Sequence, residues 1–148
     1  MRYIKEYKEY SINKDLIIVI DNTMPPEKKY LSNIINYLED SNIFYKIATE
    51  PEHILEYSKN YNIVGALSTG SDYRVNKDSN RLSYKALQYL ECPILGLCFG
   101  FQSMSKFYGQ PITGGDLNCK QFTLTDFDDS HFLFKGIDLT QQKVSFCF

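Results

Sequence analysis

The sequence predicts an α/β fold, in which a mostly parallel sheet carries helices on both faces. Three observations predict it. Short apolar or β-branched runs alternate four times along the chain with segments whose apolar residues recur at helical spacing. Turn and helix-start signals follow the runs, as at Pro25-Pro26 and Pro51-Glu52. The fourth run ends at Cys98, with glycine two residues away on each side, a pattern typical of a sharp strand-to-helix turn.

The strands are expected where apolar runs are bounded by turn residues. They are residues 16–20, 44–47, 63–67 and 94–97. The first run, Leu-Ile-Ile-Val-Ile, is apolar throughout, which is typical of a parallel strand that is buried on both faces. Parallel sheets of this kind hold their sites beyond the carboxyl ends of the strands. We therefore expect the loops at 68–71 and 98–100 to lie at the site.

The helices are expected where apolar residues fall on one face. Their apolar positions are Tyr30, Leu31, Ile34, Ile35 and Leu38; Ile54 and Leu55; Leu82, Ala86, Tyr89 and Leu90; and Phe101, Met104 and Tyr108. Beyond Gly109 the pattern changes to a turn at Gly114-Gly115 and short strands at 122–125 and 144–148. We expect one domain over residues 1–148. Its first 14 residues form a polar lead that is rich in Tyr, Lys and Glu.

Composition excludes several classes of function. The net charge of −2 gives no electrostatic attraction for nucleic acid or an anionic membrane, so neither is an expected partner. No apolar run is long enough to span a bilayer, and the first ten residues lack a signal-peptide core, so we expect a cytoplasmic protein. The four cysteines form no Cys-x-x-Cys pair and the two histidines have no metal-ligand spacing. We expect no metal and no cofactor.

Cys98 is the candidate nucleophile. Gly96 and Gly100 remove side chains where a tight turn packs, and the helix that follows directs its positive end at the sulfur, which favours the thiolate. The backbone N–H of Phe99 can donate to an oxyanion, and Gly70, on a neighbouring strand's loop, is the candidate second donor. The alternative is that Cys98 is a small buried residue at a strand end.

The stretch 93–102, Pro-Ile-Leu-Gly-Leu-Cys-Phe-Gly-Phe-Gln, resembles the signature of the class I (triad) glutamine amidotransferases. Further segments resemble the same family: residues 16–22 its first strand and turn, 65–71 its oxyanion loop, 107–115 the stretch after the elbow helix, and 130–137 the segment before its catalytic histidine. Thr69 and Ser71 depart from the usual glycine and proline of the oxyanion loop, and Thr123 replaces a glycine that the family often has.

The resemblance implies a flavodoxin-like fold and a specific chemistry. Cys98 would attack the side-chain amide of glutamine and form a thioester while ammonia leaves. The N–H groups of Gly70 and Phe99 would stabilise the oxyanion, and Gln102 would help to hold the substrate. In the family, the ammonia passes to a synthase domain or subunit, so such a partner is implied as well.

The family's His-x-Glu pair does not occur in this sequence. His53 and His131 are both expected to be solvated surface residues rather than the missing base. We therefore expect glutamine hydrolysis to be weak or absent, and whether the chain is an enzyme stays open. We also expect self-association or a partner at the C-terminal side, where a shortened domain exposes surface.

Two alternatives keep the fold and change the function. In one, the chain is a non-catalytic relic, a pseudoenzyme that binds glutamine or a protein. In the other, it is a cysteine hydrolase similar to gamma-glutamyl hydrolase, because Gln102 suits a glutamine-like substrate without excluding a γ-glutamyl chain.

Overall fold

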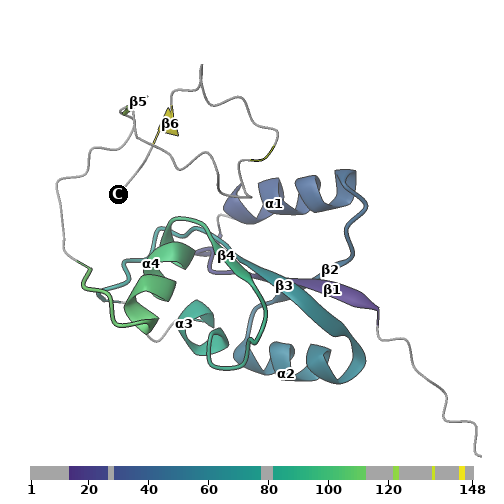
Figure 1. Cartoon of the computed structure of the whole chain (residues 1–148). Coiled ribbons are helices and arrows are strands. Elements are labelled where there is room, and N and C mark those ends of the chain that lie inside the picture. The colour runs from purple at the N-terminus through teal and green to yellow at the C-terminus, as the bar shows by residue number, and fades with distance from the viewer. Residues whose placement is uncertain are drawn as a thin grey trace, which may run out of the picture. The chain divides into compact units, whose positions relative to one another are not determined.

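Four parallel strands form the sheet on which the candidate site is built (Figure 1). In this computed structural model, residues 14–26, 29–77, 82–112, 122–123, 135 and 144–145 are described. The strands are β1 (Asp15–Ile20), β2 (Tyr45–Ala48), β3 (Asn62–Ser68) and β4 (Ile94–Gly96), in the spatial order β2-β1-β3-β4. Every neighbouring pair is parallel. The predicted α/β class with a parallel sheet is confirmed, and the strand order agrees with a flavodoxin-like fold.

Helices cover both faces of this sheet (Figure 1). They are α1 (Lys29–Asp40), α2 (Pro51–Asn60), α3 (Leu82–Ala86) and α4 (Phe99–Phe107). The predicted third helix is too long, because α3 ends at Ala86 and a turn follows. At its end the Leu87 N–H donates to the Ser83 carbonyl four residues back, at 3.2 Å. The Tyr89 N–H donates to the Ala86 carbonyl only three residues back, at 3.0 Å, so Tyr89 lies in a turn outside the helix.

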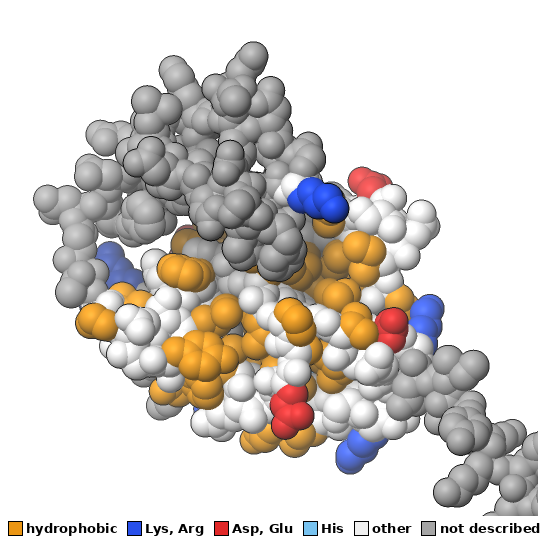
Figure 2. Space-filling model, in the orientation of Figure 1, with side chains coloured by type: hydrophobic (Ala, Val, Ile, Leu, Met, Phe, Trp, Pro, Cys, Tyr) orange, Lys and Arg blue, Asp and Glu red, His pale blue; other side chains and the backbone are white. Residues whose placement is uncertain are grey.

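The core is split between the two faces of β1. Leu16, Ile18 and Ile20 pack with Ile54 of α2 and Ala86 of α3. Val19 faces the other way and packs with Leu31 and Leu38 of α1. The strand is therefore buried on both faces, as its continuous apolar run predicts. On the surface, hydrophobic side chains are visible in several places over the described part (Figure 2).

The order in which the chain adds strands changes direction at β1. The chain crosses from β1 to β2 on one side and then returns to β3 on the other. Register brings the carboxyl ends together, because Ile20 lies opposite both Ala48 and Ser68, and Ser68 lies opposite Gly96. Residues that follow these strands therefore meet at one edge, beside the point where parallel α/β sheets bind ligands.

The structure divides the chain into two units, Met1–Ile112 and Thr113–Phe148. In the second unit β5 (Phe122–Thr123) and β6 (Val144–Ser145) pair antiparallel. The pairing falls inside the two short strands predicted there, and the single-domain organisation stays a prediction. The turn at Gly114-Gly115, nearly all of the N-terminal lead and all of the 130–137 segment except Lys135 lie outside the described residues. No helix of the described part is long and apolar enough to cross a membrane.

Candidate active site

Cys98 lies at the junction of β4 and α4 with an unusual backbone. Its φ is 50° and its ψ is −110°, a conformation that side-chain-bearing residues rarely adopt. It is the N-cap of α4, and its carbonyl accepts the N–H of Gln102 at 3.0 Å. The side chain is exposed. The alternative of a buried structural cysteine is therefore wrong, and the sharp turn predicted from the two flanking glycines is present.

Both flanking glycines are required by packing. A methyl group on Gly96 would lie 2.6 Å from the backbone N of Phe101 and 2.7 Å from its Cα. A methyl group on Gly100 would collide with the carbonyl oxygen of Ser68 and lie 2.8 Å from the Ser68 Cβ. These neighbours are backbone atoms or lie next to the backbone, so they cannot move aside easily. The turn at Cys98 can therefore pack against the start of α4 and the end of β3 only without these side chains.

The structure brings Gly70 beside Cys98. A methyl group on Gly70 would lie 3.5 Å from the Cys98 Cβ and 3.6 Å from the Tyr30 ring at the start of α1. Thr69, which precedes Gly70, is fully buried, and its N–H donates to the Ile20 carbonyl at 3.1 Å. The loop after β3 is therefore held against the end of β1. Tyr30 was not expected at the site, because its place in a helical apolar stripe gave no sign of contact with this loop.

Asn22 ties three elements together behind this loop. Its backbone N–H donates to Thr69 Oγ1 at 2.8 Å, and its side-chain amide donates to Ser68 Oγ and to the Thr69 carbonyl, both at 3.0 Å. Its Oδ1 accepts the N–H of Ser83 in α3 at 3.2 Å. Asn22 was missed as a site residue, although the polar pair Asp21-Asn22 directly after a buried strand was the signal that could have found it.

The two remaining predicted residues lie on α4. Phe99 is buried and packs against Tyr73, with 6.4 Å between the ring centroids. Gln102 is half-buried in the first turn after Cys98. Cys98, Phe99 and Gly70 are thus adjacent, and Gln102 lies one helical turn along. Their chemical roles stay predictions.

His53 of α2 contacts Thr49 and Tyr57. Its Nδ1 accepts the N–H of Thr49 at 3.3 Å, and its ring stacks on Tyr57 at 5.9 Å between centroids. It is half-buried, whereas the sequence predicts a solvated side chain. That His53 is not the base stays a prediction. His131, Cys119 and Cys147 lie outside the described residues.

Two described cysteines differ in their environments. Cys98 is exposed, whereas Cys92 is half-buried, and burial raises the pKa of the Cys92 thiol because desolvation penalises the thiolate. Within the described ranges, no group of three or more His, Cys, Asp or Glu side chains is placed to hold a metal ion.

No protein-family model matches this chain, and no solved structure matches it. Among curated proteins it is similar to GMP synthase (glutamine-hydrolyzing). The protein from Treponema denticola is 29% identical over 109 residues, which are 74% of this chain and 21% of the relative. The protein from Saccharomyces cerevisiae is 29% identical over 125 residues, 84% of this chain and 23% of the relative.

A shorter match has a different name. Over 45 residues, the chain is 44% identical to UDP-glucose 6-dehydrogenase from Rickettsia bellii, but these are 30% of this chain and 10% of the relative. The similarity that extends along most of the chain is the distant one to GMP synthases. The chain spans between 21% and 25% of the length of the GMP synthases that it matches.

Proposed function

We propose that this chain is a glutamine amidotransferase-like domain whose Cys98 attacks the side-chain amide of glutamine. The observation that carries the proposal is the backbone of Cys98, which has a positive φ at the start of α4 with Gly70 beside it. Strained backbone of this kind is concentrated at functional sites. The distant similarity to proteins named as glutamine-hydrolyzing supports glutamine as the substrate.

In the proposed reaction, the Cys98 sulfur adds to the side-chain carbonyl carbon of glutamine. The carbonyl oxygen becomes an oxyanion, which accepts hydrogen bonds from the backbone N–H groups of Phe99 and Gly70. The carbon–nitrogen bond then breaks, the nitrogen takes up a proton and ammonia leaves, and the acyl group stays on sulfur as a thioester. Water cleaves the thioester to glutamate and the free thiol. Gln102, one turn along α4, is proposed to hold the substrate.

This reaction also needs a general acid and a general base. His-x-Glu does not occur in the sequence, and His53 is engaged with Thr49 and Tyr57. Loss of general acid–base catalysis costs about 10²–10⁴ in rate. We therefore propose that glutamine turnover is weak or absent in this chain alone, while the thiol of Cys98 still reacts. Transfer of ammonia to a synthase domain or subunit belongs to the same proposal.

A second candidate function follows from the same gap. A chain with the Cys98 turn but without its acid and base can bind glutamine and leave it unreacted. This non-catalytic function and the weak glutaminase differ in one measurable respect, the Cys98-dependent release of ammonia. A relative of gamma-glutamyl hydrolase would instead prefer longer γ-linked substrates over free glutamine.

Covalent labelling tests the proposal directly. The full chain is treated with a glutamine-like diazoketone, and the modified peptide is identified by mass spectrometry. We expect one adduct on Cys98, slower labelling when glutamine is added, and no adduct at this position in Cys98→Ser. Cys92→Ser is the matched control and should be labelled like the wild type, because the Cys92 thiol is half-buried and its pKa is raised. Labelling that glutamine does not slow would contradict a glutamine site at Cys98.

A further inference from the structure

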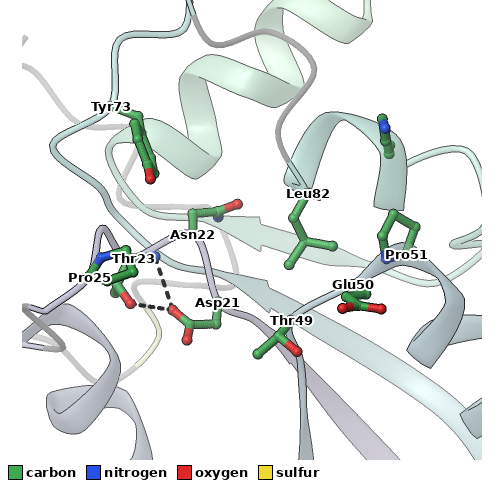
Figure 3. A pocket seen from close by; sticks show the side chains of 10 residues that line it. Asp21, Asn22, Thr23, Pro25, Thr49, Glu50, Pro51, Tyr73 and Leu82 are labelled. Carbon is green, nitrogen blue, oxygen red and sulfur yellow. Dashed lines mark hydrogen bonds between the residues drawn. The ribbon is translucent and has the colours of Figure 1, made fainter.

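A pocket of about 490 Å³ opens at the carboxyl ends of β1 and β2, and Cys98 is not among the residues that line it (Figure 3). Its lining comes from the segment after β1, the β2–α2 junction, Tyr73 and α3. These residues are Asp21, Asn22, Thr23, Pro25, Thr49, Glu50, Pro51, Tyr73, Leu82 and Lys85. The volume lies in the range of small-molecule sites. The function proposed for Cys98 makes no use of this pocket.

Two carboxylates and one ammonium group line this pocket. Asp21 uses a single oxygen, Oδ1, to accept both the N–H and the O–H of Thr23, at 2.9 and 2.5 Å. Glu50 is the N-cap of α2, but its side chain makes no capping hydrogen bond. Both carboxylates therefore keep acceptor oxygens that these local bonds do not use. Lys85, from α3, supplies the positive charge.

More of the lining surface is apolar than polar, and Asn22, Thr23 and Thr49 add uncharged polar groups. Figure 3 shows Leu82 pointing from α3 toward the strand ends that carry Asp21 and Thr49, with Pro51 on one side and Tyr73 on the other. Apolar walls with a few charged groups are typical of sites that bind small molecules and fix their orientation.

We propose that this pocket binds a free α-amino acid in its zwitterionic form. The ligand's ammonium group would donate to Glu50, its carboxylate would accept from Lys85, and its side chain would pack on Leu82. The charges favour this class of ligand over two others. A nucleotide would bring several negative charges to a lining with two carboxylates and one ammonium, and a simple amine has no carboxylate with which to accept a hydrogen bond from Lys85.

The test uses the full chain carrying Cys98→Ala, so that chemistry at the thiol cannot contribute. Isothermal titration calorimetry with a panel of free L-amino acids should find at least one that binds. Glu50→Gln and Lys85→Gln should each raise its Kd by about tenfold, as expected for loss of a charge-assisted hydrogen bond. The matched controls Glu56→Gln and Lys59→Gln, on exposed positions of α2, should leave the Kd unchanged.

Any of three results would overturn the inference. The first is that no amino acid binds the chain. The second is that Glu50→Gln and Lys85→Gln bind the amino acid as tightly as their control variants do, and the third is that the corresponding amine, which lacks the carboxylate, binds as tightly as the amino acid. Tighter binding of adenosine monophosphate would assign the pocket to nucleotides instead. Failure here is distinct from failure of the proposed function, because Cys98 labelling in the Glu50→Gln chain reports on the thiol alone.

Discussion

At the scale of single residues, the backbone of Cys98 is strained, which lowers stability at the position proposed to carry the nucleophile. A φ of 50° with a ψ of −110° is easy for glycine and strained for a residue with a Cβ. Such strain costs on the order of 1–3 kcal/mol and persists where the surrounding structure imposes it. Here it is imposed by the close packing of Gly96 and Gly100 around the turn.

This strain predicts that Cys98→Gly is more stable than Cys98→Ala by about 1–2 kcal/mol, because only glycine relieves it. Urea unfolding of the two variants, followed by circular dichroism, gives the difference in the free energy of unfolding. Both variants lose the thiol, so the comparison isolates the backbone. Equal stabilities would mean that the turn at residue 98 stores no strain.

A closely packed glycine and a glycine with a positive φ predict different losses in the free energy of unfolding on substitution by alanine. Gly100→Ala should lower the free energy of unfolding by about 3 kcal/mol, because its methyl group meets the backbone of Ser68. Gly109→Ala should cost about 1 kcal/mol, because a methyl group there meets nothing within 4 Å and only its φ of 79° is unfavourable. Gly109→Asn, which tolerates this φ, serves as the control. A Gly100→Ala variant as stable as Gly109→Ala would disprove the packing argument.

At the scale of elements, Asn22 connects β1, β3 and α3 through four hydrogen bonds. Its side chain takes part in three of them, so Asn22→Ala leaves buried groups of Ser68, Thr69 and Ser83 without that partner. We expect a loss of about 3 kcal/mol in the free energy of unfolding, measured by chemical denaturation. The exposed Asn36→Ala in α1 is the control, with a change within about 0.5 kcal/mol.

The same bonds hold the loop that carries Gly70 beside Cys98. Asn22→Ala should therefore also slow the labelling of Cys98 by the diazoketone under conditions where the protein stays folded. Unchanged labelling in a folded Asn22→Ala chain would separate the loop from the reactivity of the thiol.

Elements with a local signal could be predicted from the sequence. The strands were found because runs such as the one that became β1 are apolar throughout, and the turn at Cys98 was found because two glycines flank it at fixed spacing. The early end of α3 could not be foreseen, because Tyr89 continues the apolar spacing past the point where the bonds tighten. The contacts of Asn22 and Tyr30 depend on strand order, which brings together residues nearly fifty positions apart.

At the scale of the whole molecule, the main feature of the described residues is that they cover the sheet unevenly. Helix α1 packs on the face of β1 that carries Val19, and Leu67 of β3 packs against the same cluster. Leu95 of β4, opposite Leu67 in the register, is 44% exposed, and Leu97, just after β4, is 40% exposed. In the described part of the chain, β4 is also the last strand on its side of the sheet. Exposed apolar residues on an edge strand favour pairing with another chain.

We therefore predict that the protein self-associates reversibly through β4. Light scattering coupled to size-exclusion chromatography should show an apparent mass that rises with protein concentration. Leu95→Lys should shift the protein toward the monomer, because a charge on an edge strand opposes pairing and cannot be buried without cost. Leu55→Lys, on an exposed position of α2 with 43% exposure, is the matched control and should not change the association. A wild-type chain that stays monomeric at all micromolar concentrations would refute the prediction, since the exposed edge would then be insufficient for pairing.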